Sequence, residues 1–191
     1  HNVVCGCDEA GRGPLAGDVF AAAVIFDKDT VIEGINDSKK LTAKKREELF
    51  DEIMEKAVDF SIQTATVEEI EDINILNAAM LAMKRAVEDM DTKPDVCLID
   101  GNKTPEGLEC PAIAVVKGDA KSQAVAAASI LAKVARDRYM EQMAEQYPEY
   151  RFEKHKGYGT KLHYQMIDQY GPCGIHRMSF LKKYYAKKNG H

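Results

Sequence analysis

The sequence lacks any long hydrophobic run. No apolar stretch approaches the ~20 residues that cross a bilayer, so we expect no membrane-spanning segment and no membrane partner. A charged start, apolar stretch and small-residue cleavage site are also absent, and without such an export signal the expected location is the cytoplasm. Internal repeats, low-complexity segments and Ser/Gly-rich linkers are missing too. The 191 residues therefore predict one continuous globular unit with its own core.

The cysteines and histidines offer no recognisable disulfide framework or zinc site. There are five cysteines, an odd number, and no two are spaced as C-x-x-C. Cys5 and Cys7 lie two positions apart in a predicted strand, so we expect both to be buried on one face as small hydrophobic residues. His155, His163 and His176 have no spacing such as H-E-x-x-H, and we expect none of them to bind zinc.

Charge is unevenly distributed along the chain. The formal net charge of −5 argues against indiscriminate nucleic-acid binding. Residues 151–191 nevertheless contain nine Lys or Arg against two acidic residues, a net charge of +7, which leaves −12 for the remainder. An acidic body with a basic C-terminal end fits a metal site beside a polyanion-binding surface, although a solvated lysine face would give the same pattern.

The hydrophobic periodicity predicts an α/β fold. One apolar run of strand length ends at Asp8, and four others cover residues 18–26, 60–66, 95–100 and 111–116. A glycine-rich turn joins the run that ends at Asp8 to the run over 18–26, which predicts a hairpin. Helices are expected over 42–59, from Thr66 to about residue 90, and over 121–146 and 160–170. The first three strands have hairpin-type links, and a crossover connects the last two. This arrangement predicts a mixed five-stranded sheet flanked by helices. We expect a core of residues 1–145 and a small, basic helical segment, 146–191, packed on it within a single domain.

Four acidic residues fall at predicted strand ends. Asp8 and Glu9 follow the first strand, Asp100 follows the fourth and Asp119 follows the fifth. If strands one and four are neighbours, Asp8 and Asp100 meet, and carboxylates gathered there repel unless cations lie between them. Oxygen ligands suit Mg²⁺ or Mn²⁺, and two such ions ~4 Å apart activate water and stabilise a leaving oxygen in phosphodiester cleavage. Each Asp alone also fits a turn residue or helix cap, so the prediction of a metal site depends on their joint placement.

The stretch "CGCDEAGRGPLAG", residues 5–17, resembles the opening signature of the ribonuclease HII family. The resemblance continues, in the family's order, through "NDSKKLTAKKREELF", "ILNAAMLAMKRAV", "LIDGN", "KGDAKSQAVAAASILAKVARDRYM" and "KGYGTKLH". It is similar to the bacterial branch, because the sister ribonuclease HIII would be expected to lack the Arg of the G-R-G triplet. The resemblance implies a ribonuclease H-like fold and an endoribonuclease that acts on the RNA strand of RNA/DNA hybrids. It also implies nicking of duplex DNA on the 5′ side of embedded ribonucleotides, which leaves 5′-phosphate and 3′-hydroxyl ends and supports ribonucleotide removal.

The resemblance further implies roles for individual residues. The catalytic carboxylates, and the ligands of two Mg²⁺ or Mn²⁺ ions, would be Asp8, Glu9, Asp100 and Asp119. Substrate would be bound by Gly11, Arg12, Gly13 and Tyr158, which together detect the 2′-hydroxyl of a ribonucleotide. Glycines let a backbone approach a sugar closely, and the 2′-hydroxyl distinguishes RNA from DNA at a single nucleotide. We also expect Lys39 to hold a backbone phosphate, and the protein to be a monomer.

Two acidic residues need separate interpretation. Asp18 stands where the family would be expected to have Pro, and we expect it to mark the start of a strand without a catalytic role. Asp137, flanked by Arg136 and Arg138, is interpreted as an ion-pairing helix residue rather than a metal ligand.

Two other functions fit parts of the pattern. A phosphatase or nucleotidase acting on small phosphate esters would use the same acids but would not need the basic end. A hybrid-binding module, whose carboxylates only cap turns, would bind duplex equally well with EDTA present. Neither alternative explains why all the family's sequence blocks occur together.

Overall fold

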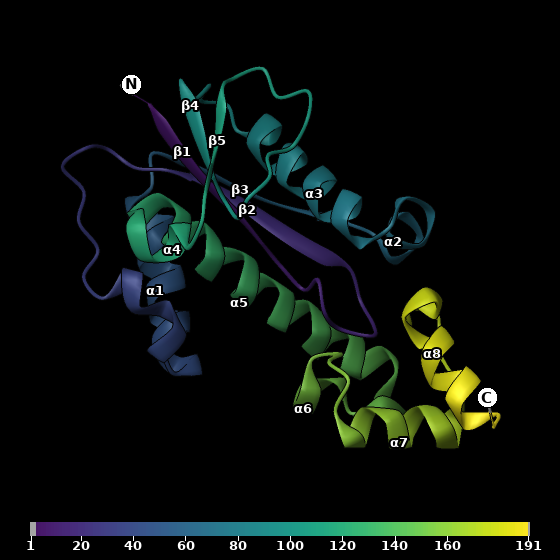
Figure 1. The fold of residues 1–191 in the computed structure, drawn as a ribbon. Helices are drawn as coiled ribbons and strands as arrows, with labels where there is room; N and C mark the ends of the chain where they lie inside the picture. Colours follow the sequence, from purple (N-terminus) through teal and green to yellow (C-terminus); the bar gives the residue numbers. More distant parts are fainter. Residues whose placement is uncertain (1–2, 191) are drawn as a thin grey trace.

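The computed structural model describes residues 3–190, apart from the side chains of Ser38 and Lys39, and contains a five-stranded mixed sheet with helices on both faces (Figure 1). The strands are β1 (Val4–Ala10), β2 (Val19–Ile25), β3 (Asp59–Ala65), β4 (Val96–Asp100) and β5 (Ala112–Val115). Their order across the sheet is β3-β2-β1-β4-β5. β2 is antiparallel to both β1 and β3, whereas β4 is parallel to both β1 and β5. The predicted fold class is confirmed.

The helices follow the predicted amphipathic segments closely. They are α1 (Ala43–Lys56), α2 (Val67–Ile73), α3 (Ile75–Asp89), α4 (Gly118–Lys121), α5 (Gln123–Gln146), α6 (Phe152–His155), α7 (Lys161–Tyr170) and α8 (Met178–Lys188), with 3₁₀ turns η1 (Ile35–Lys40) and η2 (Pro148–Tyr150). Thr66 and Glu69 form a capping box at the start of α2. The helical region after Thr66 is divided at Asn74, whose φ of 73° interrupts the helix. No helix of residues 3–190 has both the length and the apolar character to span a membrane.

Two predicted boundaries are wrong in ways that affect the site. β1 does not end at Asp8 but continues to Ala10, because Asp8 and Glu9 still pair with Ala22 and Ala21 of β2. The long helix starts at Gln123 rather than at residue 121, because the Ser122 side chain caps it and the short α4 precedes it. Asp8 and Glu9 are therefore strand residues, with side chains directed by the strand pleat.

Each face of the sheet carries its own hydrophobic core. On one face β1, β2 and β4 pack against α3, and on the other β2 packs against α1 and α5 (Figure 1). α5 crosses β1 at backbone contact: a Cβ added to Gly6 would lie 2.2 Å from the carbonyl carbon of Ala124. Only glycine fits there, so this crossing fixes the long helix against the strand that carries Asp8 and Glu9.

The segment after α5 folds back onto the loop between β1 and β2. Ala16 of this loop packs with Met140, Tyr150 and Phe152, and it also forms an isolated antiparallel bridge with His176. α7 and α8 lie beyond the end of α5, on the opposite side of the molecule from β4 and β5 (Figure 1). Residues 14–17 of this loop are thus buried beneath the C-terminal segment, whereas Arg12 and Gly13 are exposed.

Candidate active site

Three of the four predicted carboxylates share one edge of the sheet. Asp8 and Glu9 lie near the end of β1, and Asp100 is the last residue of the parallel neighbour β4. Because Cys7 pairs with Ile99, Asp8 and Asp100 follow at the same level of the two strands. Asp8 is only 6% exposed, and the other two are half-buried. The predicted meeting of Asp8 and Asp100 follows from this parallel register.

Strand alternation directs the adjacent acids to opposite faces. Cys7 packs in the core formed with α3, so Glu9, two residues later, lies on that face. Gly6 and Ala10 face the α5 side, and Asp8 lies between them. Glu9 lines a pocket together with Met80 and Asp100. The three carboxylates therefore surround the sheet edge instead of projecting from one face.

Burial disfavours the charged forms of Asp8 and Glu9. Burial, followed by the negative charges of Glu9 and Asp100, raises the pKa of Asp8 well above its ordinary value. Burial also raises the pKa of Glu9, although its hydrogen bond with Asp8 and the guanidinium of Arg12, 3.7 Å away, oppose that shift. Asp8 Oδ1 accepts a hydrogen bond from the Glu9 amide at 2.8 Å, and Asp100 Oδ1 accepts one from Gly118, also at 2.8 Å. An oxygen-only donor set with excess negative charge fits a hard divalent cation.

Asp119 lines a different pocket from Glu9 and Asp100. It lies on α4 and lines a separate pocket with Asn36 and Lys117, and its carbonyl oxygen accepts a 2.8 Å hydrogen bond from the Asn36 side chain. Across residues 3–190, no three His, Cys, Asp or Glu side chains converge closely enough to hold a metal ion. The acids thus share a region without forming a closed set of ligands.

The predicted substrate loop is held from behind by a buried arginine. Arg177 is fully buried and donates from Nη2 to the carbonyl of Gly11 at 2.7 Å and from Nε to that of Gly17 at 2.8 Å. Its Nη1 donates to the carbonyls of Arg12, at 3.1 Å, and Pro14, at 2.9 Å. Burial, reinforced by the nearby charge of Arg136, lowers the pKa of Arg177 to about 9. One side chain therefore sets the main-chain course of the whole Gly-Arg-Gly turn.

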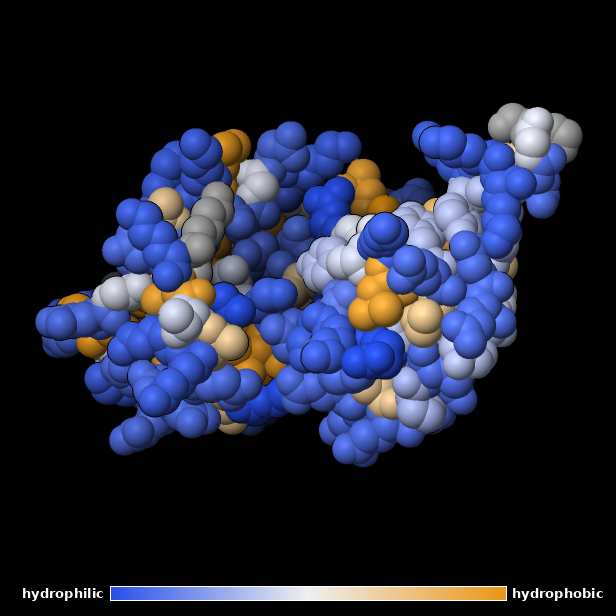
Figure 2. Space-filling view, turned by 90° about the horizontal axis from the view of Figure 1, so that it is seen from below, coloured by the Kyte–Doolittle hydropathy of each residue, from blue (hydrophilic) through white to orange (hydrophobic). Residues whose placement is uncertain are grey.

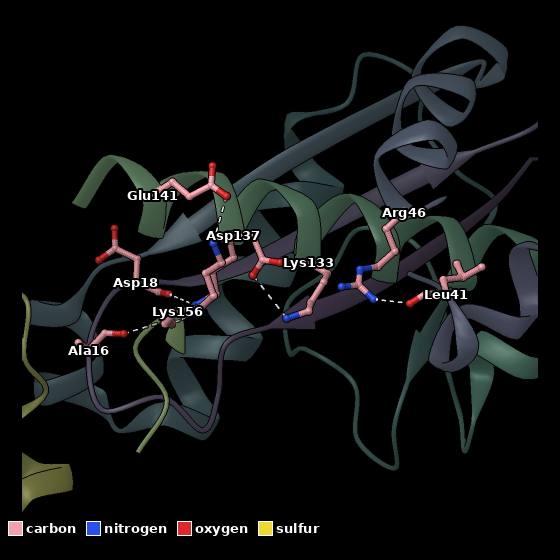
Figure 3. A network of polar contacts seen from close by, with 9 residues as sticks. Ala16, Asp18, Leu41, Arg46, Lys133, Asp137, Glu141 and Lys156 are labelled. Carbon is pink, nitrogen blue, oxygen red and sulfur yellow. Dashed lines mark hydrogen bonds and ion pairs between the residues drawn. The ribbon is translucent and has the colours of Figure 1, made fainter. Parts of the chain in front are cut away.

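A second buried guanidinium, that of Arg136 on α5, joins this loop to the segment before Tyr158. It donates to the carbonyls of Asp18 at 3.1 Å, Ala16 at 2.8 Å and Lys156 at 2.8 Å. Figure 3 shows these three acceptors drawn together beside α5. A Cβ on Gly11, whose φ is 95°, would lie 2.2 Å from Arg136 Nε, so this position requires glycine.

Tyr158 lies beside the Gly-Arg-Gly turn. Its side chain is 40% exposed and lines a recess with Glu9, Gly11 and Arg12. The Arg136 guanidinium carbon lies 5.9 Å from the centre of its ring, and Lys133 Nζ lies 5.8 Å away. The structure thus brings Gly11, Arg12 and Tyr158, three of the four predicted sensor residues, into one recess that also contains a carboxylate. The Lys39 side chain lies outside the described residues.

Sequence reasoning missed the two buried arginines. The signal for Arg136 was present: it lies four residues from both Ala132 and Met140 on the buried stripe of α5, a position typical of a core residue. Arg177 offered no such pattern, because its partners are main-chain carbonyls of a distant loop.

The two other acids considered in the sequence, Asp137 and Asp18, each have an identified partner. Asp137 pairs with Lys133, at 3.4 Å, rather than with a flanking arginine, because Arg136 is buried and Arg138 pairs with Glu47. Asp18 Oδ1 accepts a 2.9 Å hydrogen bond from the amide of Val67 at the start of α2. Both contacts are structural.

Comparison with known proteins identifies the family. The family model described as Ribonuclease HII matches residues 5–183. A Ribonuclease HII of Caldicellulosiruptor saccharolyticus is 56% identical over 182 residues, which cover 95% of this chain and 88% of that protein. The crystal structure of the ribonuclease H2 from Pyrococcus horikoshii OT3 superposes with a TM-score of 0.81 at 29% identity, covering 99% of this chain and all of the other. Bst-RNase HIII in complex with Mn²⁺, at 16% identity, shares the fold with a TM-score of 0.72 over 99% of this chain and 71% of its own. The chain therefore belongs to the ribonuclease HII family of metal-dependent type 2 ribonucleases H, endoribonucleases that act on RNA/DNA hybrids.

Proposed function

We propose that the chain also nicks duplex DNA at single embedded ribonucleotides, on the 5′ side, leaving 5′-phosphate and 3′-hydroxyl ends. The observation that carries this proposal is the recess lined by Glu9, Gly11, Arg12 and Tyr158. A carboxylate of the sheet edge and the residues expected to read a ribose lie around the same space. An enzyme that acted only on long hybrids would not need a carboxylate of the sheet edge next to the residues expected to read a single ribose.

The recess offers two kinds of contact to a ribonucleotide. Gly13 has no side chain to keep a sugar from the backbone, and a Cβ there would come no closer than 3.8 Å to its nearest neighbour, the Tyr158 ring. The exposed Tyr158 ring packs on the sugar, while its hydroxyl hydrogen-bonds the 2′-hydroxyl. Arg12, paired only at 3.7 Å with Glu9, is available for an adjacent phosphate.

The metal ligands in this proposal are Asp8, Glu9 and Asp100, with Asp119 approaching from α4. The raised pKa values of Asp8 and Glu9 support it: burial is the main cause of both, the charges of Glu9 and Asp100 add to that of Asp8, and a bound cation would favour the charged carboxylates. The related Bst-RNase HIII, crystallised with Mn²⁺, provides additional support. Two Mg²⁺ or Mn²⁺ ions, when bound, would activate a water and stabilise the leaving oxygen. The chain's own contribution is to hold the scissile phosphate beside these acids through the Gly-Arg-Gly turn.

The basic residues of segment 146–191 supply affinity for the duplex backbone in this proposal. Lys182, Lys183, Lys187 and Lys188 are exposed on α8, and phosphate contacts of this kind position a duplex without reading its sequence. Hydrophilic side chains predominate on the face seen in Figure 2, where hydrophobic residues form only small patches. Residues 1–145 would then act as the catalytic core and 146–191 as its duplex-binding extension.

The test is to map the cut by gel electrophoresis in a DNA duplex that carries one internal ribonucleotide, in Mg²⁺ and then in Mn²⁺. We expect a single metal-dependent nick 5′ of the ribonucleotide, which Asp100→Asn reduces by at least about 100-fold, as expected for loss of a metal ligand. Asp51→Asn, an identical change at an exposed position on α1, is the matched control. Full activity of Asp100→Asn would refute the ligand assignment.

The alternative functions give different results in the same assay. Release of phosphate from a free nucleotide would indicate a phosphatase, and duplex binding without cleavage, unchanged by EDTA, would indicate a binding module. If a four-ribonucleotide hybrid is cut while the single-ribonucleotide duplex stays intact, the sensing role of the Gly-Arg-Gly turn and Tyr158 is wrong.

A further inference from the structure

Three buried histidines lie directly behind Tyr158. His163 is fully buried, and His155 and His176 are 7% and 3% exposed. The rings of His155 and His163 stack with their centroids 4.1 Å apart, and Tyr150 and Phe152 surround the group. None of these histidines contributes to the chemistry proposed above.

The hydrogen bonds of this cluster assign the tautomers of His176 and His163. The amide of Cys173 donates to His176 Nδ1 at 2.9 Å, so the proton of a neutral His176 lies on Nε2. That Nε2 lies 2.9 Å from His163 Nε2, which must therefore accept. The proton of His163 is then on Nδ1, 2.8 Å from the carbonyl oxygen of Tyr158. The contacts form a one-way chain of donors that ends on the main chain of Tyr158.

This chain requires both rings to be neutral. Burial lowers the pKa of His163 to about 4 and that of His176 to about 3, and the groups around them add no carboxylate contact that would favour a charge. A single proton fits between the two facing Nε2 atoms. A second proton between them would therefore break the contact between the two rings, and the other tautomer of His163 would leave Nδ1 without a proton to donate to Tyr158.

We propose that His163 and His176 are positioning residues, which fix the backbone of Tyr158 and thereby place its ring in the ribonucleotide-sensing recess. The inference rests on the proposed sensing function of Tyr158. Neighbouring contacts hold the same segment: Arg136 donates to Lys156, and the Leu15 amide donates to the carbonyl of Gly157 at 2.8 Å. The Tyr158 carbonyl also accepts a hydrogen bond from the amide of Thr160, at 2.9 Å. Loss of the His163 contact therefore leaves this carbonyl with one hydrogen bond, so the Tyr158 backbone is held less firmly but is still held.

Two substitutions at one position separate positioning from packing. His163→Asn keeps an amide nitrogen near the place of Nδ1 and can still donate to Tyr158. His163→Gln places its amide near Nε2 and lacks that donor. The readout is the ratio of cleavage rates on a single-ribonucleotide duplex and a four-ribonucleotide hybrid, both measured on one preparation, because the ratio is independent of the folded fraction.

We expect His163→Gln to lower this ratio about tenfold and His163→Asn to preserve it within about twofold, because small misplacements of a positioning group reduce rates on this scale. Tyr158→Ala is measured beside them, and combining it with His163→Gln should lower the ratio no further. If Tyr158→Ala lowers the ratio but His163→Gln leaves it unchanged, the positioning role is refuted while the sensing function stands. If Tyr158→Ala leaves the ratio unchanged, the sensing function itself is wrong, and the positioning role falls with it.

Discussion

Arg177 Nη2 donates a 2.7 Å hydrogen bond to the carbonyl oxygen of Gly11, across 166 residues of chain. With its three further bonds to the carbonyls of Arg12, Pro14 and Gly17, this buried guanidinium couples the C-terminal segment to the loop between β1 and β2. Its role depends on the planar fork of donors, which an ammonium group cannot reproduce.

Arg177→Lys should therefore lower the free energy of unfolding by about 3 kcal/mol, because several buried carbonyls lose their donor while the charge remains buried. Urea unfolding followed by circular dichroism measures the change. Arg151→Lys, the same change at an exposed residue paired with Glu153, should stay within about 0.5 kcal/mol of the parent. Equal stabilities of the two variants would show that the fork does not support the loop.

Asp8→Asn should stabilise the protein by about 1 kcal/mol in EDTA at neutral pH, because it removes a buried charge that Glu9 and Asp100 repel. The Asn side chain keeps an oxygen to accept from the Glu9 amide. In thermal unfolding, Asp8→Asn should unfold at a higher temperature than the parent in EDTA and at a lower one after Mn²⁺ is added, because ion binding stabilises only the parent. A parent protein that unfolds at the same temperature with and without Mn²⁺ would argue against the cation site.

Acid should destabilise the protein through its buried histidines. The folded-state pKa values of His163 and His176 lie below the unfolded value of 6.5, so the unfolded chain takes up protons that the folded one does not. The resulting stability is fully present above pH 6.5 and falls as the pH approaches 4, by about 2 kcal/mol for one such histidine between pH 7 and pH 5. Urea unfolding at pH 7, 6 and 5 should give a steeper loss for the parent than for His163→Asn. Parallel pH profiles would show that His163 is not neutral in the folded protein.

Salt should reveal the role of the basic helix α8. Changing both Lys182 and Lys183 to Gln should reduce the slope of log affinity against log salt by about 2 for a duplex, because each phosphate contact contributes about 0.9. Fluorescence anisotropy with a labelled duplex in EDTA measures binding without cleavage. The matched control changes Lys28 and Lys93, which are exposed in distant loops. If the control pair changes the slope as much as the α8 pair, binding is not localised to α8.

The fold was predictable because its signals are local. Alternating or continuous apolar runs mark each strand, and Thr66 with Glu69 marks the start of α2 within four residues. The proximity of two of the acids was predictable for a related reason: Asp8 and Asp100 lie at the same level of neighbouring parallel strands, so a correct strand order brings them together. The family resemblance supplied the substrate and the role of Tyr158, which its loop position alone would not indicate.

The remaining features of the site depend on contacts that no local pattern encodes. The extension of β1 past Asp8 depends on pairing with Ala21 and Ala22, and it decides that Asp8 and Glu9 face opposite ways. Asp119 was grouped with the other acids because it follows a strand, a pattern that does not indicate its place on α4 or the hydrogen bond from the Asn36 side chain to its main-chain carbonyl. Buried arginine and histidine contradict ordinary hydropathy, and only the carbonyls and ring nitrogens of distant segments explain their burial.

The contact between Arg177 and Gly11 also orders events during synthesis. A ribosome makes the Gly11–Gly17 loop long before it makes the side chain that holds that loop, and domains fold as the chain emerges. The β1–β2 hairpin can form early, but its connecting loop stays without the guanidinium clamp until Arg177 has left the ribosome. A nascent chain that already carries Asp8, Glu9 and Asp100 thus still lacks the side chain that holds the Gly11–Gly17 loop.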